Sequence, residues 1–293
     1  MRKIKLIIIF VLLGSGFVHA QERLLHEVAD LPDPLRENSS LVFTKAGLWT
    51  MNDGPATNLY RIDERTGKIL QEVRLSGCQT MDTEALTADA NYLYIGDFGN
   101  NHEPRTNFHI LRIKLSEITK AAKQDIQAEL ISYTYEDFGV VDLNSSTDHF
   151  DCEAMLSLND KIYLFTKRRG DHRTILYELS NTPGKQLAKK LQVFNSDGLI
   201  TDAAINKSGT EIALIGYLKG HKNSFVWLLN NFKGNQFFSG KQQRIEIAKD
   251  VKSWQTEGIA YKSDNHLFIS CEQTNDVNCR LYKVSRQQLI TNK

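Results

Sequence analysis

TEALTADANYLYIGDFG, residues 83–99, is the stretch that decides the fold: a hydroxyl residue and an acid lead into two short apolar runs separated by a polar turn. A similar order recurs four more times along the chain: a small or polar residue, usually an acid, a short apolar run, a polar turn and a second, more apolar run. The other copies are SSLVFTKAGLWTMND at residues 39–53, CEAMLSLNDKIYLFTKR at 152–168, TDAAINKSGTEIALIGY at 201–217 and TEGIAYKSDNHLFISCE at 256–272. Several copies of one strand–turn–strand unit, each too small to bury its own apolar face, are typical of repeat architectures.

Each copy is followed by further strand-like runs that extend it towards a four-stranded unit. A third run of alternating character follows every copy, and fourth runs lie at residues 69–75, 129–135, 188–194 and 244–248. The copies recur at spacings of 44, 69, 49 and 55 residues, which suit blades of four antiparallel strands. The sequence therefore predicts an all-β chain, a β-propeller with five four-stranded blades.

The two ends of the repeat series predict how the ring closes. The fifth unit runs out of chain before a fourth strand, whereas residues 24–31 form a strand-like run ahead of the first unit. Pairing of these two segments would close the ring and remove an exposed sheet edge. We therefore expect a ring closed by an N-terminal strand. Two alternatives stay open: a sixth blade within the 69-residue interval, and a sandwich or two small β-domains.

Composition and the first residues bound the class of protein. A chain of 293 residues with 41% hydrophobic and 24% charged residues suits one globular body, and 36 Lys and Arg against 35 Asp and Glu give no basic surplus for nucleic acid. Residues 1–20 combine a basic start, a short apolar run and small residues before position 21, which is typical of a signal peptide. We expect a single domain at residues 21–293 that is exported, periplasmic or extracellular, with no membrane span after signal removal.

Export makes disulfides possible, and the chain has four cysteines. Cys271 and Cys279 flank a polar loop between two strand-like runs, so a bridge across that loop is the first expected pair. Cys78 and Cys152 precede or begin neighbouring units and form the second. Free thiols are the alternative for both pairs.

One oxygen-bearing side chain stands at the start of each expected innermost strand, beside the central channel. These residues are Ser40, Glu84, Glu153, Asp202 and Glu257. Carboxylates crowded in a narrow channel repel one another and stay ionised only with a cation or strong hydrogen bonds. An axial Ca²⁺ fits this flexible oxygen set better than Mg²⁺, which demands a stricter octahedron. The alternative is that these side chains accept backbone N–H bonds from neighbouring blades and staple the ring.

The loops that join second and third strands return to the same face as the axial residues. Their polar side chains are candidate ligand-binding residues: Asn52, Asp53, Asp97, Asn100, Lys167 and Arg168. Together they would form a mixed acidic and basic mouth for a polar ligand. The alternative is that Gly and Asn form the turns and that the charges are a solvated face.

Two resemblances rest on these same residues. The strings DTEALTADANYLYIGDFGNN, FDCEAMLSLNDKIYLFTK and GLITDAAIN look like a family of exported bacterial propeller proteins of unassigned function. More distantly, the axial series and TEGIAY around Glu257 are similar to calcium-dependent apyrases. That resemblance implies a five-bladed ring with Ca²⁺ on its axis and hydrolysis of nucleoside di- and triphosphates. This chain departs from the apyrases at Asp202, where they usually have a hydroxyl residue. It also departs at the turn Asn52-Asp53-Gly54, where the apyrases have two consecutive acids.

Three functions follow as hypotheses. The first is an exported binding or scaffold protein whose channel mouth holds a polar ligand, a glycan, a peptide or an envelope protein. The second is a Ca²⁺-dependent hydrolase of phosphorylated or ester substrates, in which Asp53 or Asp97 orients water. The third is a lyase or sugar hydrolase with paired rim carboxylates. Whether the chain is an enzyme stays open.

Overall fold

The computed structural model describes residues 24–55, 57–100, 105–139, 150–248 and 253–291. The expected signal peptide, residues 1–20, lies outside these residues. Among the described residues, no helix has the length and apolar character needed to cross a membrane. The described chain is built almost entirely of β-strands, with one short α-helix, α1 (Arg286–Thr291), after the last strand.

The strands form antiparallel meanders that run from the centre of the molecule outwards. In order from the centre, the meanders are β2 (Asn38–Thr44), β3 (Gly47–Asn52), β4 (Asn58–Ile62) and β5 (Ile69–Ser76); β6 (Thr83–Ala88), β7 (Tyr92–Asp97), β8 (Phe108–Lys114) and β10 (Glu129–Tyr135); β11 (Cys152–Leu158), β12 (Lys161–Thr166), β13 (Thr174–Ser180) and β14 (Gly184–Phe194); β15 (Leu199–Ile205), β16 (Glu211–Leu218), β17 (Lys222–Asn230) and β18 (Lys241–Glu246); and β19 (Thr256–Ser263), β20 (His266–Cys271) and β21 (Arg280–Ser285).

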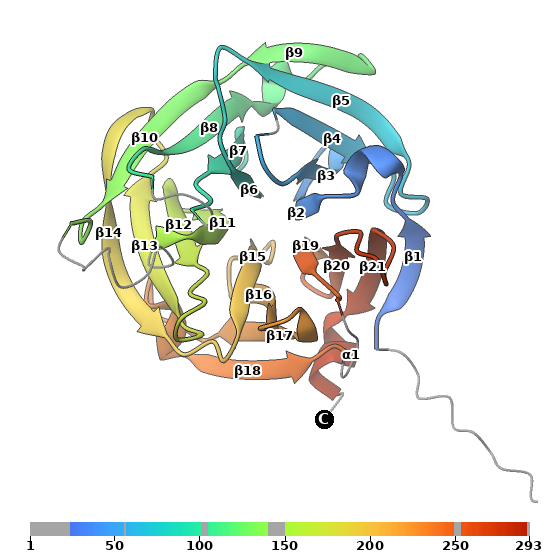
Figure 1. The fold of residues 1–293 in the computed structure, drawn as a ribbon, viewed down its shortest axis with the longest axis vertical. Helices are drawn as coiled ribbons and strands as arrows, with labels where there is room; N and C mark the ends of the chain where they lie inside the picture. Colours follow the sequence, from blue (N-terminus) through green and yellow to red (C-terminus); the bar gives the residue numbers. More distant parts are fainter. Residues whose placement is uncertain (1–23, 56, 101–104, 140–149, 249–252, 292–293) are drawn as a thin grey trace, which may run out of the picture.

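The innermost strands lie around a common axis (Figure 1). β2 contacts β6, β6 contacts β11, β11 contacts β15, β15 contacts β19, and β19 contacts β2. Large hydrophobic clusters fill the spaces between neighbouring sheets. Because side chains alternate between the two faces of a strand, each sheet packs against one neighbour on either side. The predicted all-β, β-propeller fold is confirmed.

Three additional pairings fall at the outer edges of the sheets. β1 (His26–Asp30) pairs antiparallel with β21, and Asp30 also accepts a hydrogen bond from Arg280. In the 69-residue interval, β9 (Lys123–Gln127) pairs in parallel with β5 of the preceding meander. β10 pairs in parallel with β14, which joins two meanders into one eight-stranded sheet.

The cysteine pairing expected from the sequence is wrong for this structure, because all four cysteines are free thiols. Cys271 lies in the cluster between β15–β17 and β19–β21, whereas Cys279 lies in the cluster on the other face of the same sheet. Cys152 is in the cluster between β6–β8 and β11–β13, whereas Cys78 packs in the cluster between β2–β5 and β6–β8. A sheet therefore separates the two thiols of each expected pair.

Candidate functional site

A β-bulge marks the start of every innermost strand, next to the axis. In each pairing of an innermost strand with the second strand of its meander, the register skips one residue. The skipped residues are Ser39, Glu84, Glu153, Thr201 and Glu257. Bulges re-aim side chains and recur at the rims of closed sheets and beside functional sites.

The structure thus aligns the repeats one residue differently from the sequence in two places. Ser39 and Thr201, both hydroxyl residues, are equivalent to Glu84, whereas the sequence alignment put Ser40 and Asp202 in those positions. A one-residue slip turns a side chain to the opposite face of a strand. Ser40 and Asp202 therefore do not share the bulge position of the three glutamates.

Asp202 and Ser40 join neighbouring innermost strands through hydrogen bonds. Asp202 is fully buried and accepts hydrogen bonds from the Ser40 hydroxyl and from the backbone N–H groups of Leu41, Ala203 and Ile259. These donors belong to β2, β15 and β19, which are distant in sequence. Burial raises the pKa of Asp202, while the bonds from Ile259, Ala203 and Leu41 lower it. Asp202 therefore makes the contacts expected under the alternative to metal binding, in which an axial side chain accepts backbone N–H bonds from neighbouring sheets.

Glu153 and Glu257 have a cationic neighbour supplied by the protein. Lys167 is buried, and its ammonium donates to Glu153 and, at 3.1 Å, to the Tyr217 hydroxyl. Tyr217 in turn donates to Glu257 at 2.8 Å, and Arg169 donates to Glu153 at 3.3 Å. Burial lowers the pKa of Lys167, but Glu153, Tyr217 and Glu257 together raise it well above its usual value. A lysine expected at the rim therefore lies inside the channel as a charged counter-ion.

This arrangement predicts that Lys167→Met lowers the free energy of unfolding by about 2 kcal/mol or more, because buried Glu153 then keeps only Arg169 as a cationic partner and the Tyr217 hydroxyl loses a donor. Urea unfolding followed by circular dichroism measures the change. In the double variant Lys167→Met/Glu153→Gln, the carboxylate charge that lost its ammonium partner is also removed, so we expect at least half of the loss to be recovered. A single variant within about 1 kcal/mol of wild type would contradict the role of Lys167 as a buried counter-ion.

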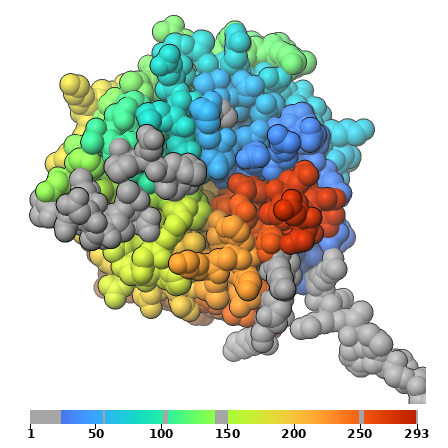
Figure 2. Space-filling view, viewed as in Figure 1, coloured from blue at the N-terminus to red at the C-terminus, as the bar shows by residue number. Residues whose placement is uncertain are grey.

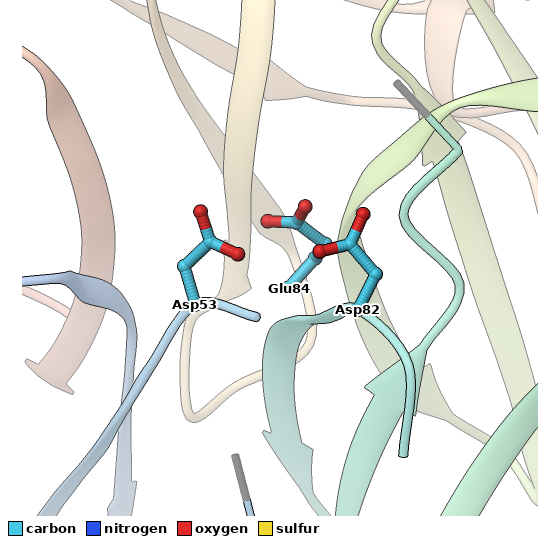
Figure 3. Close-up of side chains that lie close together, drawn as sticks. All are labelled: Asp53, Asp82 and Glu84. Atoms are coloured by element: carbon cyan, nitrogen blue, oxygen red, sulfur yellow. The ribbon is translucent and has the colours of Figure 1, made fainter. Parts of the chain in front are cut away.

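Glu84 lies instead with Asp53 and Asp82 (Figure 3). Each of the three residues offers one carboxylate oxygen, and these oxygens lie within 4.8 Å of one another. Burial, followed by the charge of Asp82, raises the pKa of Asp53 to about 6. Burial, followed by the charge of Glu153, raises the pKa of Glu84 well above its usual value. The three carboxylates repel one another in a poorly solvated place.

The other predicted binding residues are held by internal contacts. The Asp97 carboxylate accepts from Arg105 at 3.1 Å and from the N–H groups of Met81 and Asp82 at 3.0 and 2.8 Å. Although burial raises its pKa, contacts from His109 and Arg105 hold it below its usual value. Asp97 therefore positions the loop before β6.

Three further rim residues also have partners within the protein. Asn52 donates to the Pro34 carbonyl at 2.7 Å, and the Asn100 side-chain oxygen accepts from the Arg105 N–H. Arg168 makes two hydrogen bonds to Asp171, three residues further along the same loop. Of the predicted ligand-binding set, Asp53 is the residue that belongs to the carboxylate cluster. Asp82 was missed, although an acid only two residues before the predicted ligand Glu84 was a usable signal.

Two pockets open beside these residues on the face with the bulges. The larger, about 480 Å³, is lined by Glu37, Asp53, Met81, Asp82 and Asn100 among others. The second, about 370 Å³, has a lining that includes Arg36, Glu37, Gln255, Gln273, Thr274 and Asn275. Glu37 lines both pockets, so they adjoin. Figure 2 shows this face, where the red C-terminal segment lies against the blue N-terminal one.

Comparisons with known proteins bear on the fold alone. No family model and no curated protein matches the chain. Among solved structures, glutaminyl cyclase of Myxococcus xanthus matches 89% of this chain and 97% of its own, with 12% identity and a TM-score of 0.48. Hydrazine synthase of Kuenenia stuttgartiensis matches 84% of this chain with 13% identity and a TM-score of 0.43, and a protein from Lactobacillus plantarum matches 83% with 12% identity and 0.42. The chain spans 59% of the hydrazine synthase chain. The structural neighbours are β-propeller proteins, and they are similar to this chain in fold.

Proposed function

We propose that this chain is an exported β-propeller binding module that binds a glycan in a groove at the mouth of its channel. The observation that carries the proposal is the pair of adjoining pockets with Glu37 in both linings. Their combined lining comes from the segments before β2, β6 and β19 and after β3, β7 and β20, so several meanders contribute to one elongated surface.

The ring is part of this proposal, since it holds the groove segments in place. We infer five blades, one for each innermost strand, with β1 as the outer strand of the blade formed by β19, β20 and β21. Leu25 and Leu31 at the ends of β1 are buried, and Arg280 of β21 pairs with both Glu27 and Asp30. These contacts support closure of the ring by the N-terminal strand.

The chemistry of the groove favours a ligand with many hydroxyl groups. Side-chain amides and carboxylates dominate its lining, among them Glu37, Asp53, Asn100, Gln255 and Gln273. Amides both donate and accept hydrogen bonds, and ionised carboxylates accept several, which matches the paired donors and acceptors of sugar hydroxyls. The lining has three acids, Glu37, Asp53 and Asp82, against two arginines, Arg36 and Arg105, and Arg105 is already paired with Asp97. The lining therefore also disfavours an anionic ligand. A neutral glycan is the class that this lining fits best.

Binding to an array of neutral oligosaccharides and peptidoglycan fragments tests the proposal, followed by titration of the strongest glycan. Pro55→Trp and Gln273→Trp place a bulky ring in each pocket at exposed positions, and Lys189→Trp on the outer strand β14 is the matched control. We expect at least a tenfold loss of affinity in the first two variants and none in the control. Absence of any glycan binding, or equal binding by all variants, would contradict the proposal. Selective binding of a peptide library at this groove would overturn the ligand class.

A further inference from the structure

The carboxylates of Asp53, Asp82 and Glu84 have the spacing of ligands around one metal ion. One oxygen of each lies within 4.8 Å of the other two. Calcium binds oxygen at about 2.4 Å, so two of its ligand atoms can be at most about 4.8 Å apart. All three pairs meet that limit without any movement of the backbone.

Glu84 supplies an independent sign that a ligand is expected here. Its residue is only 3% exposed, and its Oε1 atom has no hydrogen-bond partner among the described residues. Figure 3 shows its carboxyl group lying between those of Asp53 and Asp82. Buried carboxylate oxygens are normally hydrogen-bonded or bound to a metal, because burial of an unpaired oxygen costs free energy.

Backbone contacts hold the two carboxylate-bearing loops together. Thr83, the first residue of β6, lies between Asp82 and Glu84 and donates both its N–H and its hydroxyl to the Gly54 carbonyl at 2.8 Å. Asp53 donates its N–H to the Glu37 carbonyl at 2.9 Å. The three side chains therefore project from segments that are fixed relative to one another, as a preorganised site requires.

Gly99 makes the space in which two of the carboxylates lie. A Cβ atom on Gly99 would lie 2.3 Å from Asp82 Oδ2 and 2.6 Å from Glu84 Oε1. Any side chain at this position would displace both oxygens. On the other side, Asp53, Asp82 and Gly99 line the larger pocket, so the cluster is accessible from the groove.

We propose that Asp53, Asp82 and Glu84 bind one Ca²⁺ at the inner end of the groove. Calcium accepts six to eight oxygen ligands in flexible geometry, so three carboxylates leave positions for water or for hydroxyl groups of a bound glycan. Mg²⁺ fits less well, since it demands a near-ideal octahedron at shorter distances. The inference deepens the proposed function, and the role of the ion in glycan binding rests on it.

The remaining axial acids differ from this set in their contacts. Glu153 and Glu257 already contact Lys167 or Tyr217, and both Asp202 oxygens accept hydrogen bonds. The pKa of Glu84, by contrast, is raised by burial and by neighbouring carboxylates. The cation that the axial acids were expected to bind is therefore assigned to a place beside the axis, between blades that begin with β2 and β6.

Calorimetric titration of Ca²⁺ into chelator-treated protein tests the site. We expect one ion per chain, a rise in melting temperature with Ca²⁺, and weaker binding of Mg²⁺. Asp53→Asn should weaken Ca²⁺ binding at least tenfold, whereas Asp276→Asn, the same change at an exposed acid, should leave it unchanged. Circular dichroism checks that each variant is folded. If Asp53→Asn does not fold, Asp82→Asn replaces it in the titration, with the same expected loss of Ca²⁺ binding.

The outcomes separate this inference from the proposed function. Wild-type protein that gives neither heat nor a melting shift with Ca²⁺ would overturn the metal site, as would unchanged binding in both Asp53→Asn and Asp82→Asn. Pro55→Trp should still bind Ca²⁺, because Pro55 is not among the ligands. Failure to bind any glycan while Ca²⁺ still binds would therefore contradict the proposed function alone. Failure to bind Ca²⁺ while glycan still binds would contradict the metal site alone.

Discussion

Asp202→Ala is expected to lower the free energy of unfolding by about 4 kcal/mol or more, since each buried group left without a partner costs roughly 1–3 kcal/mol. The carboxylate has four donors: the Ser40 hydroxyl and the backbone N–H groups of Leu41, Ala203 and Ile259. Alanine removes the acceptor for all of them at a fully buried position. Total stabilities of domains are typically about 5–15 kcal/mol, so the variant should be close to unfolded at 37 °C.

Ser40→Ala is the matched control for this prediction. The Ser40 hydroxyl donates to Asp202 and accepts from the Leu86 N–H at 2.9 Å, so its removal leaves Asp202 with its backbone donors. We expect a loss of about 1–2 kcal/mol. Urea unfolding followed by tryptophan fluorescence measures both variants. Equal losses in the two would show that the three backbone donors contribute nothing beyond the hydroxyl.

The repeat pattern predicted the fold because local chemistry and global architecture agree. Each copy is an apolar strand, a polar turn and a second apolar strand, and such units bury both faces when they pack side by side around an axis. The strand-like run at residues 24–31 stood out because the last unit lacked a partner. Its pairing with β21 required only complementary strands, which sequence patterns show well.

The site was harder to predict, because its details depend on positions that periodicity does not fix. A bulge adds one residue without changing residue types, so Ser40 was aligned where Ser39 lies. Lys167 was expected at the rim, since nothing in a loop sequence tells whether a long side chain turns inward towards Glu153. Cysteine pairing failed for a related reason: proximity along the chain does not show which face of a sheet Cys279 occupies.

Removal of residues 24–31 is expected to abolish the single cooperative unfolding transition. The deletion takes away all of β1, which pairs with β21 from His26 to Asp30. It also exposes the apolar surface now covered by the buried Leu25 and Leu31, and it leaves Arg280 without its acidic partners. An open ring has a free strand edge, and an unpaired edge both weakens the last blade and invites association between chains. Differential scanning calorimetry with light scattering measures both effects.

A chain that begins at Leu24 is the control, because it lacks the preceding residues but keeps β1. It should unfold in one transition like the longer chain. A synthetic peptide of residues 22–33 added to the truncated protein should restore part of the transition, since strand pairing in trans can replace the missing edge. If the chain that begins at Pro32 melts like the control, then β1 is an accessory strand and the contacts between β19 and β2 alone hold the ring together. Rescue by the peptide would instead locate the cooperative link between the two ends of the chain in the pairing of β1 with β21.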